Sequence, residues 1–486
     1  MNRTHTSIYS LNKNLSTFNI LDSLSVEVHV KENPYDLPLD YLFGMAARKN
    51  KKRGFLFVSK LLGKHIPVAP VTSLLSGALL GIRLIEELFK QQVPKRDEII
   101  EALLTGKGEK DLYQELMRRP FVLPEETLFI GFAETATSLG QSVFDLFDNA
   151  AYIHTTRENV QGLESVIKFE EEHSHATAQS CFGKEELFKK SGPIVLVDDE
   201  ITTGKTAINI IEAIHREYPR DEYVVVSLLD WRSEQDKKRY YELEQRLGIT
   251  VKTVTLLAGE ITVEGTPVEE EGIYEYSRPS EPIRALVEKI HLNQFNQFKR
   301  MEDLELSSVT SNGAINHVPY SAMTGRFNGV TSDDRTDINY YARNVGEELG
   351  KSRSGGRALC LGTGEFMYLP MKIASFMGEN IYFQSTTRSP IHRVDQEGYA
   401  VRSGFSFPCP DDDRVTNYFY NIEYGSYEDI YLCIERNVAD EQLSSLLEAL
   451  QEVGAKRIFV VIMNEGDMFN DGQKQLSANA YGKLPG

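Results

Sequence analysis

Two adjacent carboxylates, Asp198 and Asp199, follow four apolar residues and precede a short loop with the sequence TTGKT. The apolar run 194–197 is typical of a buried strand, and apolar positions within 208–214 recur on one helix face. Open α/β sheets bind ligands where their parallel strands end, and phosphates bind the free N–H groups of a helix N-terminus. The pattern therefore predicts a sugar phosphate site, in which the carboxylates accept hydrogen bonds from vicinal hydroxyls. The expected phosphate ligands are Thr202, Thr203, Gly204, Lys205 and Thr206.

The ending GKT also occurs at the end of ATP-binding P-loops, where another glycine stands five positions before the glycine that precedes the lysine. That position holds Asp199, whose carboxylate would repel a polyphosphate and whose Cβ removes the glycine-only backbone of the turn. An ATPase is therefore disfavoured. An ordinary strand–helix turn that carries surface acids is the structural alternative to a sugar phosphate site.

The stretch VLVDDEITTGKT resembles the phosphoribosyl pyrophosphate signature of type I phosphoribosyltransferases. The resemblance implies an α/β fold with a parallel sheet and flanking helices. It also implies that Asp198 and Asp199 hold the ribose hydroxyls as catalytic residues, while residues 202–206 wrap the 5-phosphate. The implied cofactor is Mg²⁺, held mainly by substrate oxygens near the two aspartates.

A second strand, loop and helix pattern begins at Leu128 with LFIGFAETATSLG. It resembles the pyrophosphate loop of the same family, so Ala133, Glu134 and Thr135 are predicted to bind the pyrophosphate. Glu134 stands where the family usually has glycines, which leaves its role open between magnesium and a base amine. Arg157 follows the next strand and is the basic residue expected at the pyrophosphate, with a surface arginine as the alternative.

Two further segments are candidates for substrate contacts. Residues 48–65 concentrate basic side chains in an acidic chain, which fits either an anionic substrate or a solvated helix end and turn. Residues 158–193 take the place of the family's catalytic hood, which excludes water from the reacting centre. This hood is acidic, and its His173 and His175 fit either a proton shuttle or a solvated loop. Trp231 fits core packing better than stacking on a base.

The chain of 486 residues has 53 basic and 71 acidic residues, and its net charge is −18. This balance argues against nucleic acid or an anionic membrane as a partner, so a phosphate site has to be local. The N-terminus lacks the apolar core of a signal peptide. The apolar run 68–82 is too short to span a bilayer, so a buried helix is expected there. Four scattered cysteines fit a reducing compartment, and we expect a cytoplasmic protein.

The strand and helix patterns that position these residues divide the chain into two domains. We expect a polar N-terminal segment, a transferase-like domain, a linker and a C-terminal domain over residues 1–25, 26–300, 301–320 and 321–486. The segment to about residue 30 is expected to be either frayed or an edge strand. Within the transferase-like domain, we expect a helix that begins near Pro38 and a strand over 55–58. A charged helix is predicted over 280–306.

The C-terminal domain repeats the layout of the first domain. Glycine, glutamate and Thr-Thr-Arg recur at equal spacing, so that Gly131, Glu134 and Thr155 match Gly362, Glu365 and Thr386. The segments from Ile194 and Ile430 align without gaps, and the strand IFVVIM falls opposite YVVVSL at the same offset. We therefore expect a second α/β domain that is a degenerate copy, with chance similarity among βαβ units as the alternative.

The second copy has Asp440, Glu441 and Gln442 where the phosphate loop has glycine, lysine and threonine, so we expect it to have lost sugar phosphate binding. Its remaining role would be to recognise substrate or to cover the first site. TTRSP (386–390), after TGRF (324–327), resembles the TRSP domain. That domain follows a divergent phosphoribosyltransferase domain in bacterial proteins associated with tellurium-resistance and stress gene clusters.

These resemblances imply a magnesium-dependent phosphoribosyltransferase, a glycosyltransferase that joins a nitrogenous base to phosphoribosyl pyrophosphate and makes or salvages a nucleotide-like metabolite. Phosphorolysis or hydrolysis of a nucleotide would use the same groups. A non-enzymatic sensor of phosphoribosyl pyrophosphate or a nucleotide is the alternative, because function depends on the site and not on the fold. The base, the reaction direction and the oligomeric state stay open, and a homodimer is allowed.

Overall fold

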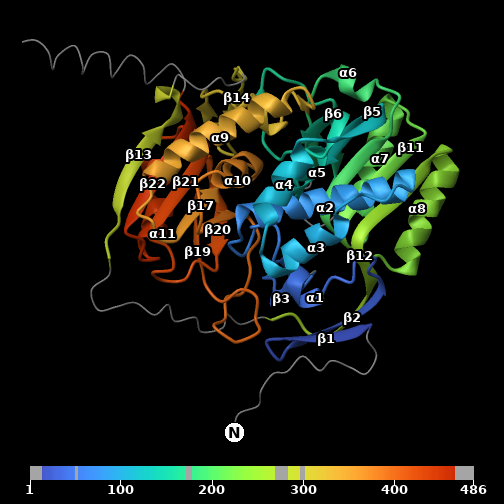
Figure 1. The fold of residues 1–486 in the computed structure, drawn as a ribbon, viewed down its shortest axis with the longest axis horizontal. Coiled ribbons are helices and arrows are strands. Elements are labelled where there is room, and N and C mark those ends of the chain that lie inside the picture. Colours follow the sequence, from blue (N-terminus) through green and yellow to red (C-terminus); the bar gives the residue numbers. More distant parts are fainter. Residues whose placement is uncertain (1–13, 50–52, 171–177, 269–282, 296–301, 466–486) are drawn as a thin grey trace, which may run out of the picture.

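The computed structural model describes residues 14–49, 53–170, 178–268, 283–295 and 302–465, which form two α/β domains side by side (Figure 1). The first domain contains an eight-stranded sheet in the order β1-β2-β12-β11-β10-β5-β6-β16. Its five central strands are parallel: β5 (Phe121–Gly131), β6 (Phe147–His154), β10 (Ile194–Ile201), β11 (Glu222–Asp230) and β12 (Thr250–Gly265). This arrangement confirms the predicted α/β fold with a mostly parallel sheet.

The predicted strand before the two aspartates is β10. Its residues 194–197 are buried, as expected of a parallel strand that is covered on both faces. Val197 pairs with Gly131 of β5, so the carboxyl ends of both strands lie at the same edge of the sheet. Asp198 and Asp199 follow at that edge, where they are only half-buried.

Helices α2 (Pro70–Phe89) and α5 (Ala136–Phe144) pack against this sheet and against each other. The apolar run 68–82 falls largely within α2, whose buried face confirms the prediction of a buried helix. None of the helices in the described part of the chain is long and apolar enough to cross a membrane.

The N-terminal part of the chain agrees with the prediction in part. β1 (Leu15–Ile20) and β2 (Leu24–Glu32) extend the first sheet with β1 at its edge, because β2 pairs with the late strand β12. The helix expected near Pro38 is a single turn, α1 (Leu39–Leu42), whereas the strand expected at 55–58 is β4 (Phe55–Ser59), which pairs with β3 (Phe43–Ala47) as a hairpin. The pairing of the residues after α1 overrides the local helical pattern.

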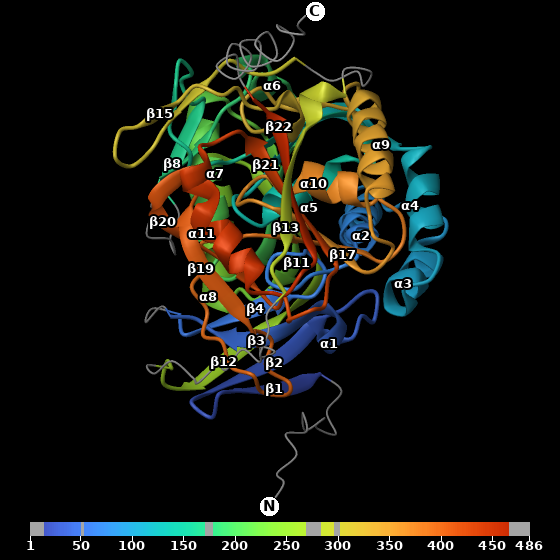
Figure 2. The same cartoon turned by 90° about the vertical axis from the view of Figure 1, so that its left-hand side faces the viewer.

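The second domain contains a parallel sheet in the order β13-β22-β21-β17-β18. Its strands are β17 (Ala358–Gly362), β18 (Ile381–Ser385), β21 (Asp429–Arg436), β22 (Arg457–Asn464) and β13 (Leu286–His291). β13 contradicts the charged helix predicted over 280–306. It also comes from residues that the sequence assigned to the first domain, yet it lies beside β22 (Figure 2). Pairing with the edge of the second sheet holds this segment extended.

Strand registers support an internal repeat. Leu128 of β5 pairs with Ile194 of β10, and the matching residues Leu359 and Ile430 pair in the second sheet. The predicted offset fails by one residue at the last strand. Ile194 pairs with Tyr223, but Ile430 pairs with Ile458 and not with the next residue. The second copy is therefore one residue shorter between these two strands.

A buried polar cluster joins the two domains. Helix α10 (Tyr368–Ala374) of the second domain contacts α5 of the first. The Lys372 Nζ atom lies 2.9 Å from Asp145 Oδ2 and donates a hydrogen bond to Tyr113 Oη at 2.6 Å. Tyr368 donates a hydrogen bond to the same carboxylate. All four side chains are buried, so the interface contains an ion pair that is removed from water.

Candidate functional site

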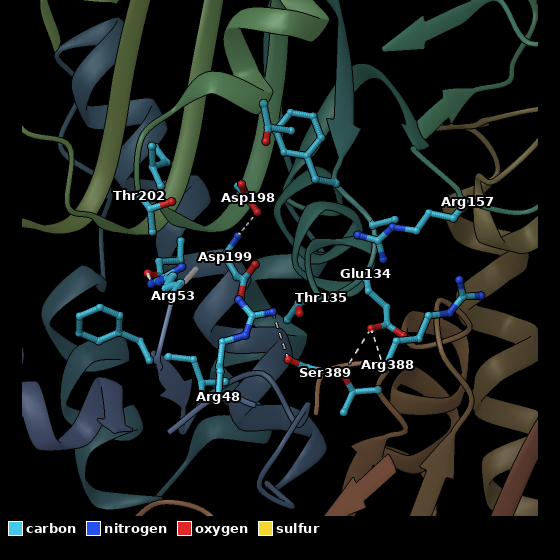
Figure 3. A pocket seen from close by; sticks show the side chains of 18 of the residues that line it. Arg48, Arg53, Glu134, Thr135, Arg157, Asp198, Asp199, Thr202, Arg388 and Ser389 are labelled. Carbon is cyan, nitrogen blue, oxygen red and sulfur yellow. Dashed lines mark hydrogen bonds and ion pairs between the residues drawn. The ribbon is translucent and has the colours of Figure 1, made fainter. Parts of the chain in front are cut away.

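The predicted site residues converge on one cavity of about 650 Å³ between the two domains (Figure 3). From the first domain, the residues that line it include Asp198, Asp199, Thr202, Thr203, Gly204, Thr206, Ala133, Glu134, Thr135 and Arg157. Lys205, the first residue of helix α7 (Lys205–Glu217), is absent from the described lining, although the next residue, Thr206, belongs to it. Segments that are far apart in sequence are thus brought together where β5 and β10 end.

The loop between β10 and α7 depends on its glycine. Gly204 has a φ of 72°, in the left-handed region that favours glycine. A Cβ atom there would lie 2.5 Å from Tyr240 Oη, and this hydroxyl donates a hydrogen bond to the Gly204 carbonyl at 3.0 Å. The tyrosine therefore fixes the turn that precedes the first N–H groups of α7.

The two aspartates differ in their environment. The backbone N–H of Asp199 donates a hydrogen bond to Asp198 Oδ1 at 2.9 Å. Burial and the neighbouring Glu200 raise the pKa of Asp199 to about 6, and the contact with Asp198 only partly opposes this. Glu200 itself forms an ion pair with Arg53. Asp199 is therefore a carboxylate that titrates close to physiological pH.

The site fits a magnesium ion that depends on substrate oxygens. Carboxylates such as Asp198 and Asp199 are oxygen ligands of the kind that Mg²⁺ prefers. No group of three or more acidic, histidine or cysteine side chains in the described residues is arranged to hold a metal. The described side chains would therefore supply only part of the ligand set, and substrate phosphates would supply the others.

The basic segment 48–65 contributes to the cavity in part. Arg48, Arg53 and His65 line it, and Arg48 Nη2 donates a hydrogen bond to Ser389 Oγ of the second domain at 3.4 Å (Figure 3). Burial lowers the pKa of His65 to about 3, so its ring is neutral at physiological pH. The segment thus contributes to the wall of the cavity and is not merely a solvated turn.

Glu134 lines the cavity and makes contacts within the first domain and with the second domain. Its Oε1 atom lies 3.3 Å from Nζ of the buried Lys64. Its Oε2 atom accepts hydrogen bonds from Thr387 Oγ1 at 3.3 Å and from the Arg388 N–H at 3.4 Å. Although burial opposes it, the charges of Lys64 and Arg388 lower the pKa of Glu134. The carboxylate is thus engaged by Lys64 and by the second domain.

The second domain supplies cavity residues that sequence reasoning missed, namely Thr387, Arg388, Ser389, Pro390, Arg414, Val415 and Thr416. The repeated Thr-Thr-Arg signal was visible in the sequence. Its position opposite the first domain's loop was not, because that depends on how the domains pack. An apolar wall formed by Leu56, Phe57, Phe132 and Val225 was missed for the same reason.

Two other candidates are the hood and Trp231. Within the hood, β8 (Ile167–Glu170) and β9 (Ala178–Cys181) pair as a hairpin, while His173 and His175 lie outside the described residues. Trp231 is 3% exposed and stacks on Phe57 with ring centroids 4.8 Å apart. Trp231 therefore packs in the core, as the sequence favoured.

Each of the two domains matches a known protein family. Residues 42–260 match the family model "Phosphoribosyl transferase", and residues 323–450 match the TRSP domain that lies C-terminal to it. No curated protein gives a significant match.

Solved structures with similarity include adenine phosphoribosyltransferase from Trypanosoma brucei in complex with AMP, pyrophosphate and ribose-5-phosphate. It is 11% identical with a TM-score of 0.27, over 47% of this chain and 82% of that chain. Orotate phosphoribosyltransferase from Aeropyrum pernix is 17% identical with a TM-score of 0.17, over 35% and 78%. Similarities of this size support no functional argument, whereas the two family matches cover the greater part of the chain. The chain therefore belongs to the proteins in which a phosphoribosyl transferase domain is followed by a TRSP domain.

Proposed function

We propose that this phosphoribosyltransferase is magnesium-dependent and joins a nitrogenous base to the anomeric carbon of phosphoribosyl pyrophosphate, which makes or salvages a nucleotide-like metabolite in the cytoplasm. One observation carries the proposal. An acidic strand end, a glycine-containing helix N-terminus and Arg157 all face the same cavity of about 650 Å³. These groups match a ribose, a monophosphate and a diphosphate, which are the three parts of the substrate.

The difficult step is the departure of pyrophosphate from a ribose that becomes cation-like. Asp198 and Asp199 would accept hydrogen bonds from the ribose hydroxyls and fix the sugar. The N–H groups that follow Gly204 would hold the 5-phosphate. Arg157 and the Ala133–Thr135 loop would hold the departing pyrophosphate. Bound Mg²⁺ would neutralise part of the negative charge on the leaving group.

The incoming base has an apolar wall to lie against. Leu56, Phe57 and Phe132 line the cavity, and planar bases stack on apolar and aromatic side chains. Arg48 and the neutral His65 are nearby polar groups that could orient such a base. The base would thus be held between the β4 hairpin strand and the end of β5.

Turnover with a panel of purine and pyrimidine bases tests the proposal. We expect pyrophosphate release from phosphoribosyl pyrophosphate with at least one base, and a large loss of that activity in Arg157→Ala. Binding without turnover for every base, unchanged in Arg157→Ala, would instead indicate a sensor.

The raised pKa of Asp199 predicts a pH dependence. Below about pH 6 the carboxyl group gains a proton and accepts fewer hydrogen bonds from the ribose. The value of kcat/KM reports groups of the free enzyme, so we expect it to rise as the pH increases through about 6 and then to level. Asp199→Asn is the comparator, because the substrate's own ionisation is the same for both proteins. An identical acidic limb in that variant would contradict the assignment.

A further inference from the structure

A carboxylate from each domain holds the Thr-Thr-Arg turn of the other domain. Glu365 of the second domain accepts hydrogen bonds from Thr156 Oγ1 at 2.6 Å and from the Arg157 N–H at 3.2 Å. Glu134 makes the matching contacts with Thr387 and Arg388 of the second domain (Figure 3). Each turn is therefore completed by a side chain that its own domain does not supply.

The surroundings of the two turns are repeated as well. The Ala133 N–H donates to Thr155 Oγ1 at 2.8 Å, and the Gly364 N–H donates to Thr386 Oγ1 at 2.9 Å. In each half the glycine-containing loop comes first in the sequence, its glutamate follows, and the Thr-Thr-Arg turn comes last. The two halves thus present equivalent loops to each other across the interface.

Each half also adds a short extended segment to the edge strand of the other half. Val68 pairs with Phe383 of β18, and Val330 of β16 (Val330–Thr331) pairs with Tyr152 of β6. Gly63, before Val68, lies so close to Phe383 that a Cβ would come within 2.7 Å of its ring. A reciprocal exchange of this kind is the property of a twofold interface between copies of one unit.

The two halves differ in their phosphate loops. Arg157 and its counterpart Arg388 both line the cavity that contains the phosphate loop, and both also line a second cavity of about 340 Å³. The described lining of the second cavity includes Glu365 but no residue of 440–442, the positions that replace the phosphate loop. The second half thus brings no phosphate loop to this cavity, while its Glu365 holds a turn of the first half.

Glu365 is itself fixed by a buried cation. Arg326 Nε lies 3.7 Å from Glu365 Oε2, and Arg326 Nη1 lies 2.9 Å from both Glu158 Oε1 and Glu435 Oε2. Arg326 is 2% exposed, so solvent screens these contacts little. The carboxylate that holds the Arg157 backbone is therefore held in turn by Arg326 of the second domain.

We propose that Glu365 is a positioning residue of the transferase site, through which the TRSP domain acts as a built-in partner subunit. The inference rests on the proposed function, because it requires Arg157 to bind pyrophosphate. Glu365 orients the Thr156–Arg157 turn and with it the guanidinium group that faces the cavity. Misplacement of a binding group by about 1 Å can lower a rate by about a hundredfold. The TRSP domain therefore contributes to pyrophosphate binding without needing its own phosphate site.

The test compares two ligands in one variant. We expect Glu365→Gln to weaken the binding of inorganic pyrophosphate with Mg²⁺ by about tenfold to a hundredfold, measured by calorimetry on the full chain. Affinity for ribose 5-phosphate should stay within about twofold, because the two aspartates and the phosphate loop hold that ligand. Glu435→Gln is the matched control, since Glu435 pairs with the same Arg326 but does not contact the turn. It should change neither affinity.

A second variant guards against a folding defect. Thr156→Val removes the hydroxyl that donates to Glu365. The double variant Thr156→Val with Glu365→Gln should bind pyrophosphate no more weakly than the weaker-binding of the two single variants. Equal losses for both ligands in Glu365→Gln, or additive losses in the double variant, would overturn the positioning role. If the wild-type protein binds both ligands and Glu365→Gln binds pyrophosphate with unchanged affinity, the positioning role is also overturned. If the wild-type protein binds neither ligand, the proposed function fails with it.

Discussion

Replacement of both Asp198 and Asp199 by asparagine is expected to lower kcat/KM for phosphoribosyl pyrophosphate by about 10²–10⁴-fold. Each carboxylate would lose a charge-assisted hydrogen bond to a ribose hydroxyl, worth about 1.5–3 kcal/mol. Two such bonds correspond to about 3–6 kcal/mol, and a factor of ten corresponds to about 1.4 kcal/mol. Initial rates of pyrophosphate release measure the effect.

The same variant contains its own control. Pyrophosphate would be held by Arg157 and the Ala133–Thr135 loop, so its affinity should change far less than that of ribose 5-phosphate. Both aspartates are half-buried at the end of β10, so the fold should tolerate the amides. If ribose 5-phosphate still binds with wild-type affinity, the aspartates do not hold the ribose.

Lys372→Met is expected to destabilise the protein by about 3–5 kcal/mol, because it leaves the buried carboxylate of Asp145 without its cation. Lys372 and Asp145 are 1% and 3% exposed, which keeps water from replacing the lost partner. Urea unfolding followed by fluorescence measures the change. The cluster joins α5 to α10, so the loss should affect both domains together.

The double variant Asp145→Asn with Lys372→Met separates charge burial from packing. Removing both charges of a buried pair is often close to neutral, so this variant should recover at least half of the lost stability. The amide oxygen can still accept the hydrogen bond from Tyr368. If Lys372→Met is as stable as the wild-type protein, the ion pair contributes little to the stability of the interface.

The sequence predicted features that lie within one short stretch of chain. The strand, the two aspartates, the phosphate loop and the following helix are contiguous, and their hydrophobic pattern alone fixes their order. The sequence also showed that the segment from Gly131 to Arg157 is repeated in the second half. The spacing between the matching residues is the same in both halves, although the phosphate loop has changed.

Features that arise from long-range pairing were missed. The segment of β13 was predicted as part of a charged helix, whereas its pairing with β22 holds it extended. For Glu134, nothing in the neighbouring sequence reveals that Thr387 and Arg388 reach it. Arg48 belongs to the basic segment that the sequence singled out, but its contact with Ser389 could not be foreseen. Each of these contacts depends on domain packing, which no local pattern encodes.

The exchange of edge segments also bears on the order in which the chain folds. β16, which pairs with β6, is the last strand of the first sheet to be synthesised. Val68, synthesised early, finds its partner only when Phe383 of the second domain exists. During synthesis, the edge of β6 therefore stays unpaired until the polypeptide has grown well past the rest of the first domain. Contacts between such distant residues slow folding, so the two halves are expected to reach the native state together and not in succession.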